Sequence, residues 1–240
     1  MKYKDKFIQI ACDGGAATGK STGANLISKK YKLKFLSSGI LYRYAAHIIL
    51  KHKPKNNIFF IKSKFKNINI NKLNKINLNS PEISAFSAVI AKNNNIRKIL
   101  KKFQIGFAKK NRNCCIEGRD IATKILPNSD VKFFFKCNLK IAALRRFKEL
   151  KKNNPKLKLK DVEKALKIRN ISDTKRKNSP LLKHRDSIEI DTGKLNKRAM
   201  LTKMSKFVDK AIKLKYVNWT MLKKRQSASK GIWKPLRSRF

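Results

Sequence analysis

Residues 7–31 read FIQIACDGGAATGKSTGANLISKKY, and this stretch decides the fold. Residues 14–21 within it follow the spacing GxxxxGK[ST]. The apolar run at 7–12 predicts a buried strand, and a helix is expected over 19–31. A glycine-rich turn between a buried strand and a helix directs successive backbone N–H groups, and the positive end of the helix, at one bound anion. The stretch therefore predicts a phosphate-binding loop.

A chance match to this spacing is expected roughly once in 150 chains of the same composition. In loops of this kind the lysine reaches the β- and γ-phosphates of a nucleoside triphosphate and the following hydroxyl holds Mg²⁺. We therefore expect Lys20 to contact the phosphates of ATP and Ser21 to bind Mg²⁺. The complete expected ATP-binding loop is Gly14, Gly15, Ala16, Ala17, Thr18, Gly19, Lys20, Ser21 and Thr22.

The formal charge is +47, and lysine supplies 48 of the 61 positive residues. Asparagine clusters with lysine, as in residues 66–79 (KNININKLNKINLN), which an A/T-rich coding sequence would produce without selection for binding. We read most of this charge as a solvated surface. It should still attract polyanions non-specifically and speed the capture of anionic substrates.

The four cysteines, Cys12, Cys114, Cys115 and Cys137, lie in apolar, strand-like runs without a CxxC pair. This pattern favours buried free thiols in a reducing compartment over a zinc site or a disulfide framework. The apolar run at 7–12 is too short for a signal peptide, and no later stretch has the length of a membrane span. We expect a cytoplasmic protein.

Strands are also expected at 34–37, 113–117, 131–137 and 187–191, and helices at 39–52, 81–92, 95–111, 139–151, 160–171 and 196–214. In the helix at 139–151, Asn138 is a candidate cap, and Ile141, Leu144, Phe147 and Leu150 share one face. Strands alternating with helices predict an α/β fold, a parallel sheet covered on both faces.

Three segments lie outside this pattern. Residues 53–79 are rich in lysine and asparagine and read as an exposed insertion with a β-like FFI at 59–61. Residues 151–160 separate two helices and are a candidate mobile lid. Residues 216–240 follow a single domain over 1–215 and read as a basic tail with little periodicity. Two states are open for this tail: disorder, or weak docking on the domain.

Five further motifs follow the loop in order. They are LSSGILYR at 36–43, IR at 96–97, IEGRDIAT at 116–123 followed by Pro127 to Lys132, LRR at 144–146, and RNISDTKR at 169–176 running into SPL at 179–181. This series, closed by residues 186–192, resembles that of bacterial cytidylate (CMP) kinases, which are P-loop nucleoside monophosphate kinases. The matches keep their order over residues 8–214.

The resemblance implies a three-layer P-loop kinase fold with a small nucleotide-binding insertion, here reduced and placed at 53–80, and a lid. It implies Mg²⁺-dependent transfer of the γ-phosphoryl group of ATP to CMP or dCMP. Seven of the thirteen arginines fall in the matched motifs. Arginine's planar fork suits phosphate better than lysine does. The implied catalytic residues are Lys20, Arg43, Arg119, Arg145 and Arg176.

By the same resemblance, Arg43, Arg119 and Arg176 hold the acceptor phosphate and Arg145 contacts the phosphates of ATP. The spacing of Arg169, Asp173 and Arg176 puts them on one face of a helix. They are either a solvent-exposed ladder of ion pairs, or Arg169 and Asp173 hold the ribose hydroxyls. The resemblance places Asp120, Arg97 and Ser87 at the edge of the cytosine base. Ser38 touches the substrate or caps the helix at 39–52. Glu117 is either a carboxylate beside the metal or a charge at the end of a strand.

The sequence departs from the family pattern at several positions. Ser37 replaces the usual Asp, Gly15 stands where Pro is common, Ala122 replaces a Gly, and Asn170 replaces an acidic residue. Two other functions remain open from the sequence: a P-loop kinase with a different nucleotide or small-molecule acceptor, and a basic RNA-binding protein on a kinase fold. No RNA-binding motif with interleaved aromatic residues is visible, so we expect no specific nucleic-acid partner. We also expect a monomer, because no self-complementary apolar helix face is spare.

Overall fold

The computed structural model describes residues 7–66, 68–73, 76–78, 80–151 and 154–230, and the side chains of these residues except 71 and 218–230. Its centre is a parallel five-stranded sheet in the order β2-β3-β1-β4-β5. The strands are β1 (Gln9–Gly14), β2 (Lys34–Ser37), β3 (Cys114–Gly118), β4 (Val131–Lys136) and β5 (Ile188–Asp191). The predicted α/β fold with a parallel sheet is confirmed.

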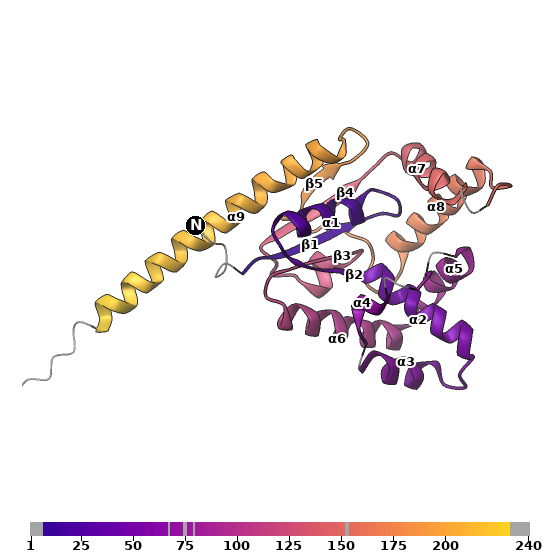
Figure 1. Ribbon diagram of the computed structural model, residues 1–240, viewed down its shortest axis with the longest axis horizontal. Helices are drawn as coiled ribbons and strands as arrows, with labels where there is room; N and C mark the ends of the chain where they lie inside the picture. The colour runs from indigo at the N-terminus through magenta and orange to yellow at the C-terminus, as the bar shows by residue number, and fades with distance from the viewer. Residues whose placement is uncertain (1–6, 67, 74–75, 79, 152–153, 231–240) are drawn as a thin grey trace, which may run out of the picture.

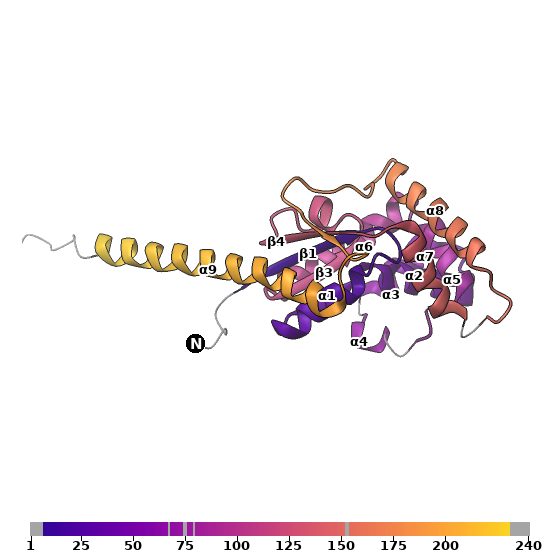
Figure 2. The same cartoon turned by 90° about the horizontal axis from the view of Figure 1, so that it is seen from above.

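Helices cover both faces of this sheet (Figures 1 and 2). They are α1 (Lys20–Lys30), α2 (Ser38–His52), α3 (Asn57–Lys66), α4 (Ile70–Leu73), α5 (Pro81–Ile90), α6 (Asn94–Lys110), α7 (Leu139–Lys151), α8 (Leu159–Lys175) and α9 (Lys197–Lys230), with a short π-helical segment, η2 (Ile121–Ile125). Of the described helices, none has both the length and the apolar character that crossing a membrane requires.

Alternation along the strands divides the core into two layers. On β3, Cys114 and Ile116 face the cluster formed with α2, α3, α5 and α6, whereas Cys115 faces the cluster formed with α1 and α9. Phe133 and Phe135 of β4 also belong to the second cluster and are fully buried. Successive strand residues point to opposite faces. A strand such as β3 therefore contributes side chains to both layers, whereas the clustered residues of β4 lie in the second layer.

The insertion at 53–79 differs from its prediction. The FFI at 59–61 lies inside the helix α3, not in a strand. Asn56 Oδ1 accepts hydrogen bonds from the backbone N–H groups of Ile58 and Phe59 and so caps the helix start. Ile61 and Phe65, four residues apart, lie on one buried face and pack into the core. The segment is therefore not simply an exposed insertion.

The apolar face expected on α7 is wrong in part, although Phe147 of that face does pack against a buried cluster. Ile141 and Leu144 are exposed, and the helix buries Ala142 and Ala143 instead. These small side chains belong to a third cluster with Val162 and Leu166 of α8, because small residues let two helices approach closely. Asn138 does cap α7 as predicted, since its Oδ1 accepts from the backbone N–H of Lys140 at 2.9 Å.

The closing helix is longer than expected. α9 continues to Lys230 and projects from the body of the molecule (Figures 1 and 2), so the described part of the tail, 216–230, is helical. Its first half packs through Met204, Val208 and Ile212 on the layer that contains α1. Residues 231–240 lie outside the described part.

Candidate active site

The phosphate-binding loop joins β1 to α1 at the carboxyl end of the sheet. Gly19 precedes the helix with a left-handed backbone, φ 75°, a conformation that glycine adopts without strain. Thr18 Oγ1 donates to the carbonyl of Gly15 at 3.0 Å, and Thr192 Oγ1 donates to the carbonyl of Thr18 at 2.8 Å. The loop is thus fixed from within and from the end of β5. The predicted position between strand and helix is confirmed.

Lys20 and Glu117 form a buried ion pair beside this loop. Lys20 Nζ lies 2.7 Å from Glu117 Oε2, and the two residues are 7% and 3% exposed. Glu117 is the last residue but one of β3 and pairs with Ser37 at the end of β2, so sheet register sets its position. Its Oε1 accepts hydrogen bonds from Ser37 Oγ and, at 3.1 Å, from Ser21 Oγ. The expected lysine, the expected metal-binding hydroxyl and the open candidate Glu117 therefore meet at one point.

The charges of this pair support each other. Burial opposes the ionised form of Glu117, but Lys20, hydrogen bonds from Lys20 and Ser37, and Arg119 outweigh it and lower its pKa. Burial also lowers the pKa of Lys20, against the attraction of Glu117.

Asp13, in β1 directly before the loop, holds the start of the loop through hydrogen bonds that the sequence did not predict. Its carboxylate accepts the backbone N–H of Ile121 at 2.9 Å and that of Ala122 at 2.7 Å. Burial raises its pKa to about 7, although the two backbone donors and Lys20 oppose the rise. A charged residue at the end of an apolar strand was the available signal. Asp13 joins the phosphate loop to the segment that follows Arg119.

A cluster of arginines faces the loop region. Arg119 Nε donates to Asp173 Oδ2 at 2.7 Å, and Arg176 Nη1 lies 3.4 Å from Asp173 Oδ1. Burial lowers the pKa of Arg169 to about 10, and repulsion from Arg119, Arg43 and Arg146 adds to the shift. Guanidinium groups this close repel one another. The cluster therefore concentrates positive charge that an anion with more than one negative charge would neutralise.

Arg43 supplies the most direct sign of such an anion. Burial lowers its pKa, with Glu117 opposing and Arg146 and Arg119 adding to the shift. Its buried Nε has no hydrogen-bond acceptor within the described part of the chain. Buried donors normally have acceptors, so a ligand oxygen is the natural partner of this group.

Arg97 and Asp120 form a second buried pair, near the end of α5. Arg97 Nη2 donates to Asp120 Oδ2 at 2.6 Å, and Arg97 Nη1 donates to the carbonyl of Ala91 at 3.2 Å. The guanidinium lies over the ring of Tyr42, 5.7 Å from its centroid. The two residues expected at the base edge are thus brought together. Ser87, expected beside them, is buried on α5, and its hydroxyl donates to the carbonyl of Ser84.

Two other predictions are refined. Ser38 is not the cap of α2, since the helix begins at Ser38 and Ser37 occupies the cap position. Ser38 is buried against Gly118, where an added Cβ would lie 3.1 Å from the Cβ of Ser38. Arg145 donates to Thr192 Oγ1 at 3.0 Å and to the carbonyl of Thr192 at 2.8 Å. Because Thr192 in turn donates to the carbonyl of Thr18, a chain of hydrogen bonds connects Arg145 to the phosphate loop.

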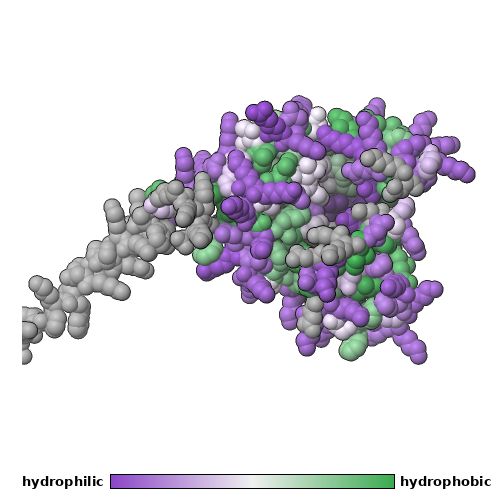
Figure 3. Space-filling view, viewed as in Figure 1, coloured by the Kyte–Doolittle hydropathy of each residue, from purple (hydrophilic) through white to green (hydrophobic). Residues whose placement is uncertain are grey.

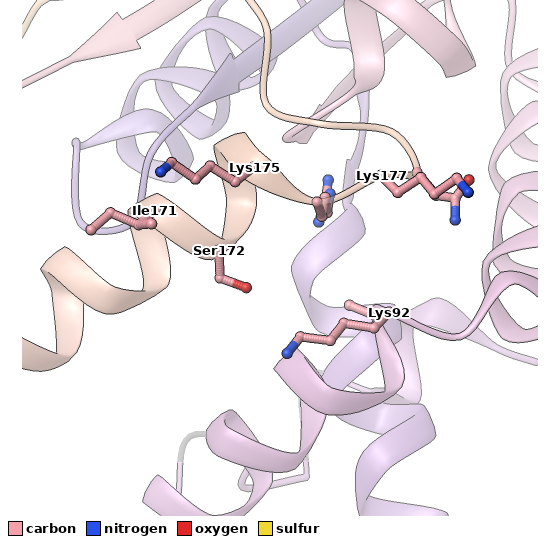
Figure 4. A pocket seen from close by; sticks show the side chains of 8 residues that line it. Lys92, Ile171, Ser172, Lys175 and Lys177 are labelled. Atoms are coloured by element: carbon pink, nitrogen blue, oxygen red, sulfur yellow. The ribbon is translucent and has the colours of Figure 1, made fainter.

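A basic cavity of about 340 Å³ opens between α8 and the turn that joins α5 to α6. Figure 4 shows Ser172 on α8 and, across the space, Lys92 on the turn. The lining also includes Lys175, Arg176 and Lys177. Arg176 links this opening to the arginine cluster. On the face drawn in Figure 3, hydrophilic side chains alternate with smaller hydrophobic patches. The cavity suits the entry of an anionic ligand.

Comparison with known proteins gives a consistent result. The family model described as cytidylate kinase matches residues 10–210. The cytidylate kinase of Bartonella tribocorum is 35% identical over 210 residues, which are 85% of this chain and 96% of that protein. That of Bartonella henselae is 33% identical over 213 residues, 87% of this chain and 97% of that protein. That of Rickettsia rickettsii is 31% identical over 204 residues, 85% of this chain and 92% of that protein.

A solved structure of an uncharacterised protein from Eubacterium ventriosum superimposes with a TM-score of 0.52 at 16% identity, covering 85% of this chain and 99% of that one. At this identity the likeness concerns the fold alone. The sequence relatives carry the assignment further, because the family match spans nearly all of the described sheet and its helices. The chain belongs to the cytidylate kinase family.

Proposed function

We propose that this chain transfers the γ-phosphoryl group of ATP to CMP or dCMP, giving ADP and CDP or dCDP. The observation that carries the proposal is a phosphate-binding loop with Lys20 together with a half-buried cluster of arginines. Such a site can hold two mutually repelling anions in line, which is most of what phosphoryl transfer requires from a protein.

On the ATP side, residues 14–22 would surround the phosphates with backbone N–H groups. Lys20 would exchange its partner Glu117 for the β- and γ-phosphates as ATP enters. Arg145, held by Thr192, would complete the charge around the transferring group. As the bond from the γ-phosphorus to the bridging oxygen breaks, negative charge moves onto ADP, and these cations stabilise it.

On the acceptor side, Arg43, Arg119 and Arg176 would hold the phosphate of CMP, with Arg43 Nε finding its missing acceptor there. The attacking atom is an oxygen of that phosphate, which is already anionic and needs no general base. Arg169 and Asp173 would bind the ribose, and Arg97, Asp120 and Ser87 the base, with Ser38 at the substrate. These assignments follow the family resemblance, and the pairs Arg119–Asp173 and Arg97–Asp120 support them.

Mg²⁺ would be held by Ser21, with Glu117 beside it. Mg²⁺ prefers oxygen ligands and usually takes only one or two carboxylates together with substrate phosphates and water. The Ser21 hydroxyl and Glu117 Oε1, 3.1 Å apart, fit that preference, and the described residues contain no richer group of three metal-binding side chains. When bound, the ion would neutralise phosphate charge.

Three further features belong to the same proposal. Residues 151–160 would act as a lid that excludes water, although 152–153 lie outside the described residues. Residues 53–80 would form the reduced nucleotide-binding insertion. The free cysteines and the use of ATP favour a cytoplasmic location, and we expect a monomer.

The test is a coupled ADP-release assay with CMP, dCMP, UMP, AMP and GMP as acceptors. We expect CMP or dCMP to give the highest kcat/KM, with activity dependent on Mg²⁺ and on Lys20. Preference for another acceptor would favour a different nucleotide kinase. Absence of acceptor-stimulated ADP release with every nucleotide would refute the kinase assignment, and steeply salt-dependent RNA binding that survives Lys20→Ala would then support the RNA-binding alternative.

A further inference from the structure

The phosphate loop is held by a side chain of α8 as well as by its own hydrogen bonds. Asn170 Oδ1 accepts the backbone N–H of Ala16 at 3.1 Å, across 154 positions of sequence. The loop N–H groups are the donors that an anion would use, so this contact decides how one of them is oriented before any nucleotide arrives.

Gly15 makes room for this contact. A Cβ at position 15 would lie 3.1 Å from Asn170 Oδ1 and 3.3 Å from Thr18 Cγ2. Gly15 is not among the residues with positive φ. What its missing side chain provides is therefore space, not an unusual backbone conformation. Both Gly15 and Asn170 are positions where this chain departs from the family pattern, and the structure places them in contact.

Ala16 fixes the loop to the same pair of helices a second time. It is 6% exposed, and it belongs to the cluster formed by Ala142 and Ala143 of α7 with Val162 and Leu166 of α8. The backbone N–H and the side chain of one loop residue thus both contact the α7–α8 pair. A shift of α8 cannot leave the loop unchanged.

α8 carries residues of the acceptor side at the same point. Arg169 precedes Asn170 directly. Asp173 follows one turn later, where it binds Arg119 and Arg176. One rigid helix therefore contacts the phosphate loop through Asn170 and forms part of the arginine cluster through its neighbours.

We propose that Asn170 is a positioning residue that couples the two substrate sites, an inference that rests on the proposed function. An acceptor phosphate draws the arginine cluster together and fixes α8, and the Asn170–Ala16 hydrogen bond passes this constraint to the loop that receives ATP. Thermodynamic linkage requires the effect to be reciprocal, so ATP raises the affinity for the acceptor by the same factor. An amide performs this task without adding a negative charge beside the phosphates.

The test measures binding without turnover. The dissociation constant of a non-hydrolysable ATP analogue is determined by calorimetry with and without saturating CMP, and the ratio of the two is the coupling factor. For the wild-type chain we expect a ratio clearly above one. In Asn170→Ala the ratio should fall by roughly two- to ten-fold, the range that a single hydrogen bond accounts for. Thr174→Ala, on an exposed position of α8 whose hydroxyl donates to its own helix, is the matched control and should keep the wild-type ratio.

Two more variants separate positioning from general damage. Asn170→Asp keeps an acceptor for the Ala16 N–H, so it should retain the coupling ratio. Because its charge repels phosphate, it should weaken the binding of the ATP analogue equally with and without CMP. Gly15→Ala crowds Asn170 and should lower the ratio in the wild-type chain. It should have a smaller further effect in Asn170→Ala, where Asn170 Oδ1, the nearer of the two crowding atoms, is gone and only Thr18 Cγ2 remains. Thermal unfolding of each variant checks that the fold persists.

A wild-type ratio of one, or an unchanged ratio in Asn170→Ala, would overturn the coupling. So would loss of coupling in Asn170→Asp, which retains the acceptor. The proposed function is judged separately by ADP release from the wild-type chain. If that chain phosphorylates CMP but Asn170→Ala keeps the coupling ratio, only the role of Asn170 is wrong.

Discussion

Asp120→Asn tests how the chain chooses its base. Cytosine presents an amino donor at the position where uracil presents an oxygen acceptor. Asp120 Oδ2 is occupied by Arg97 Nη2 at 2.6 Å, and a carboxylate can accept through its other oxygen from the cytosine amino group, whereas it repels the oxygen of uracil. An amide at position 120 keeps the shape but can present either an oxygen or an NH₂ group.

The size of the effect follows from the burial of the pair. The side chains of Arg97 and Asp120 are each 10% exposed, so a base bound there makes its contacts away from water. One good base contact of this kind is worth about 1–3 kcal/mol, which corresponds to about a 5- to 150-fold change in selectivity at roughly 1.4 kcal/mol per factor of ten. We expect Asp120→Asn to reduce the ratio of kcat/KM for CMP over UMP by an amount in that range, with part of the change arising as a gain for UMP.

The same substitution has a separate cost in stability. Removing one charge from a buried ion pair costs about 3–5 kcal/mol when no partner remains. The amide oxygen can still accept from Arg97, so the loss should be about 1–3 kcal/mol. Asp120→Ala offers no such acceptor and confounds specificity with unfolding, which makes Asp120→Asn the sharper variant.

The measurement is a coupled assay of ADP release with CMP and with UMP at one ionic strength, alongside thermal unfolding of each variant. Asp161→Asn, an exposed acid in the first turn of α8, is the control for the chemical change. A variant at position 120 that loses activity toward CMP and UMP in equal proportion would show that Asp120 is structural or acts at the phosphate. The account of base selection would then be wrong.

Lys20→Ala should abolish CMP-dependent ADP release and lower the free energy of unfolding by about 3 kcal/mol, because Glu117 stays buried without its cation. Adding Glu117→Gln should restore stability without restoring turnover. A Lys20→Ala chain as stable as the wild type would contradict this prediction. For Asp173, burial opposes ionisation, but Arg119 and Arg176 outweigh it and hold its pKa below the usual range. Its ion pairs therefore stabilise the fold fully at pH values above its unfolded pKa of about 3.9, and this stabilisation is lost as the pH falls through the lowered folded-state pKa. Asp173→Asn should therefore reduce the fall of Tm in acid. An equal slope of Tm against pH in both chains would argue against this prediction. Removal of residues 218–240 should leave kcat unchanged, because Lys215 still contacts Asp130 and the carbonyl of Phe7. Loss of turnover in the folded truncated chain would show that the removed part of α9 contributes to catalysis.

The sequence predicts the strands well because their apolar runs are short and bounded, and the runs of β1, β3 and β4 are mostly buried. It fails at α3, where Phe59, Phe60 and Ile61 look like a strand by composition. The helical period becomes visible only over a longer window, in which Ile61 and Phe65 share a face. It fails at α7 for a different reason. The longer apolar residues Ile141 and Leu144 suggest the buried face, but close packing against α8 selects Ala142 and Ala143, and only the tertiary structure shows that choice.

For the site, motif order predicts which residues assemble, but not the partners that fix them. Asp13 and Thr192 form hydrogen bonds on either side of the loop, from β1 and from the end of β5. The charge of Asp13 in an apolar strand marks it as unusual, but no motif predicts the partners of either residue. The sequence predicts Lys20 as a ligand of phosphate but not its burial or its ion pair with Glu117. Contacts between residues far apart in sequence decide all three cases.

The distribution of acids shows how the site keeps its attraction for anions. The chain has only 14 acidic residues, and two of them, Asp120 and Asp173, pair with three arginines of the site, Arg97, Arg119 and Arg176. Arg43 and Arg169 also face this cluster, where neighbouring guanidiniums help to lower the pKa of each. Pairing with a carboxylate fixes a planar guanidinium before a ligand arrives, which saves the entropy of ordering it later. Complete neutralisation would remove the field that attracts the ligand. Two carboxylates among five guanidiniums meet both requirements, because they orient the forks and leave a net positive charge for the substrate phosphates.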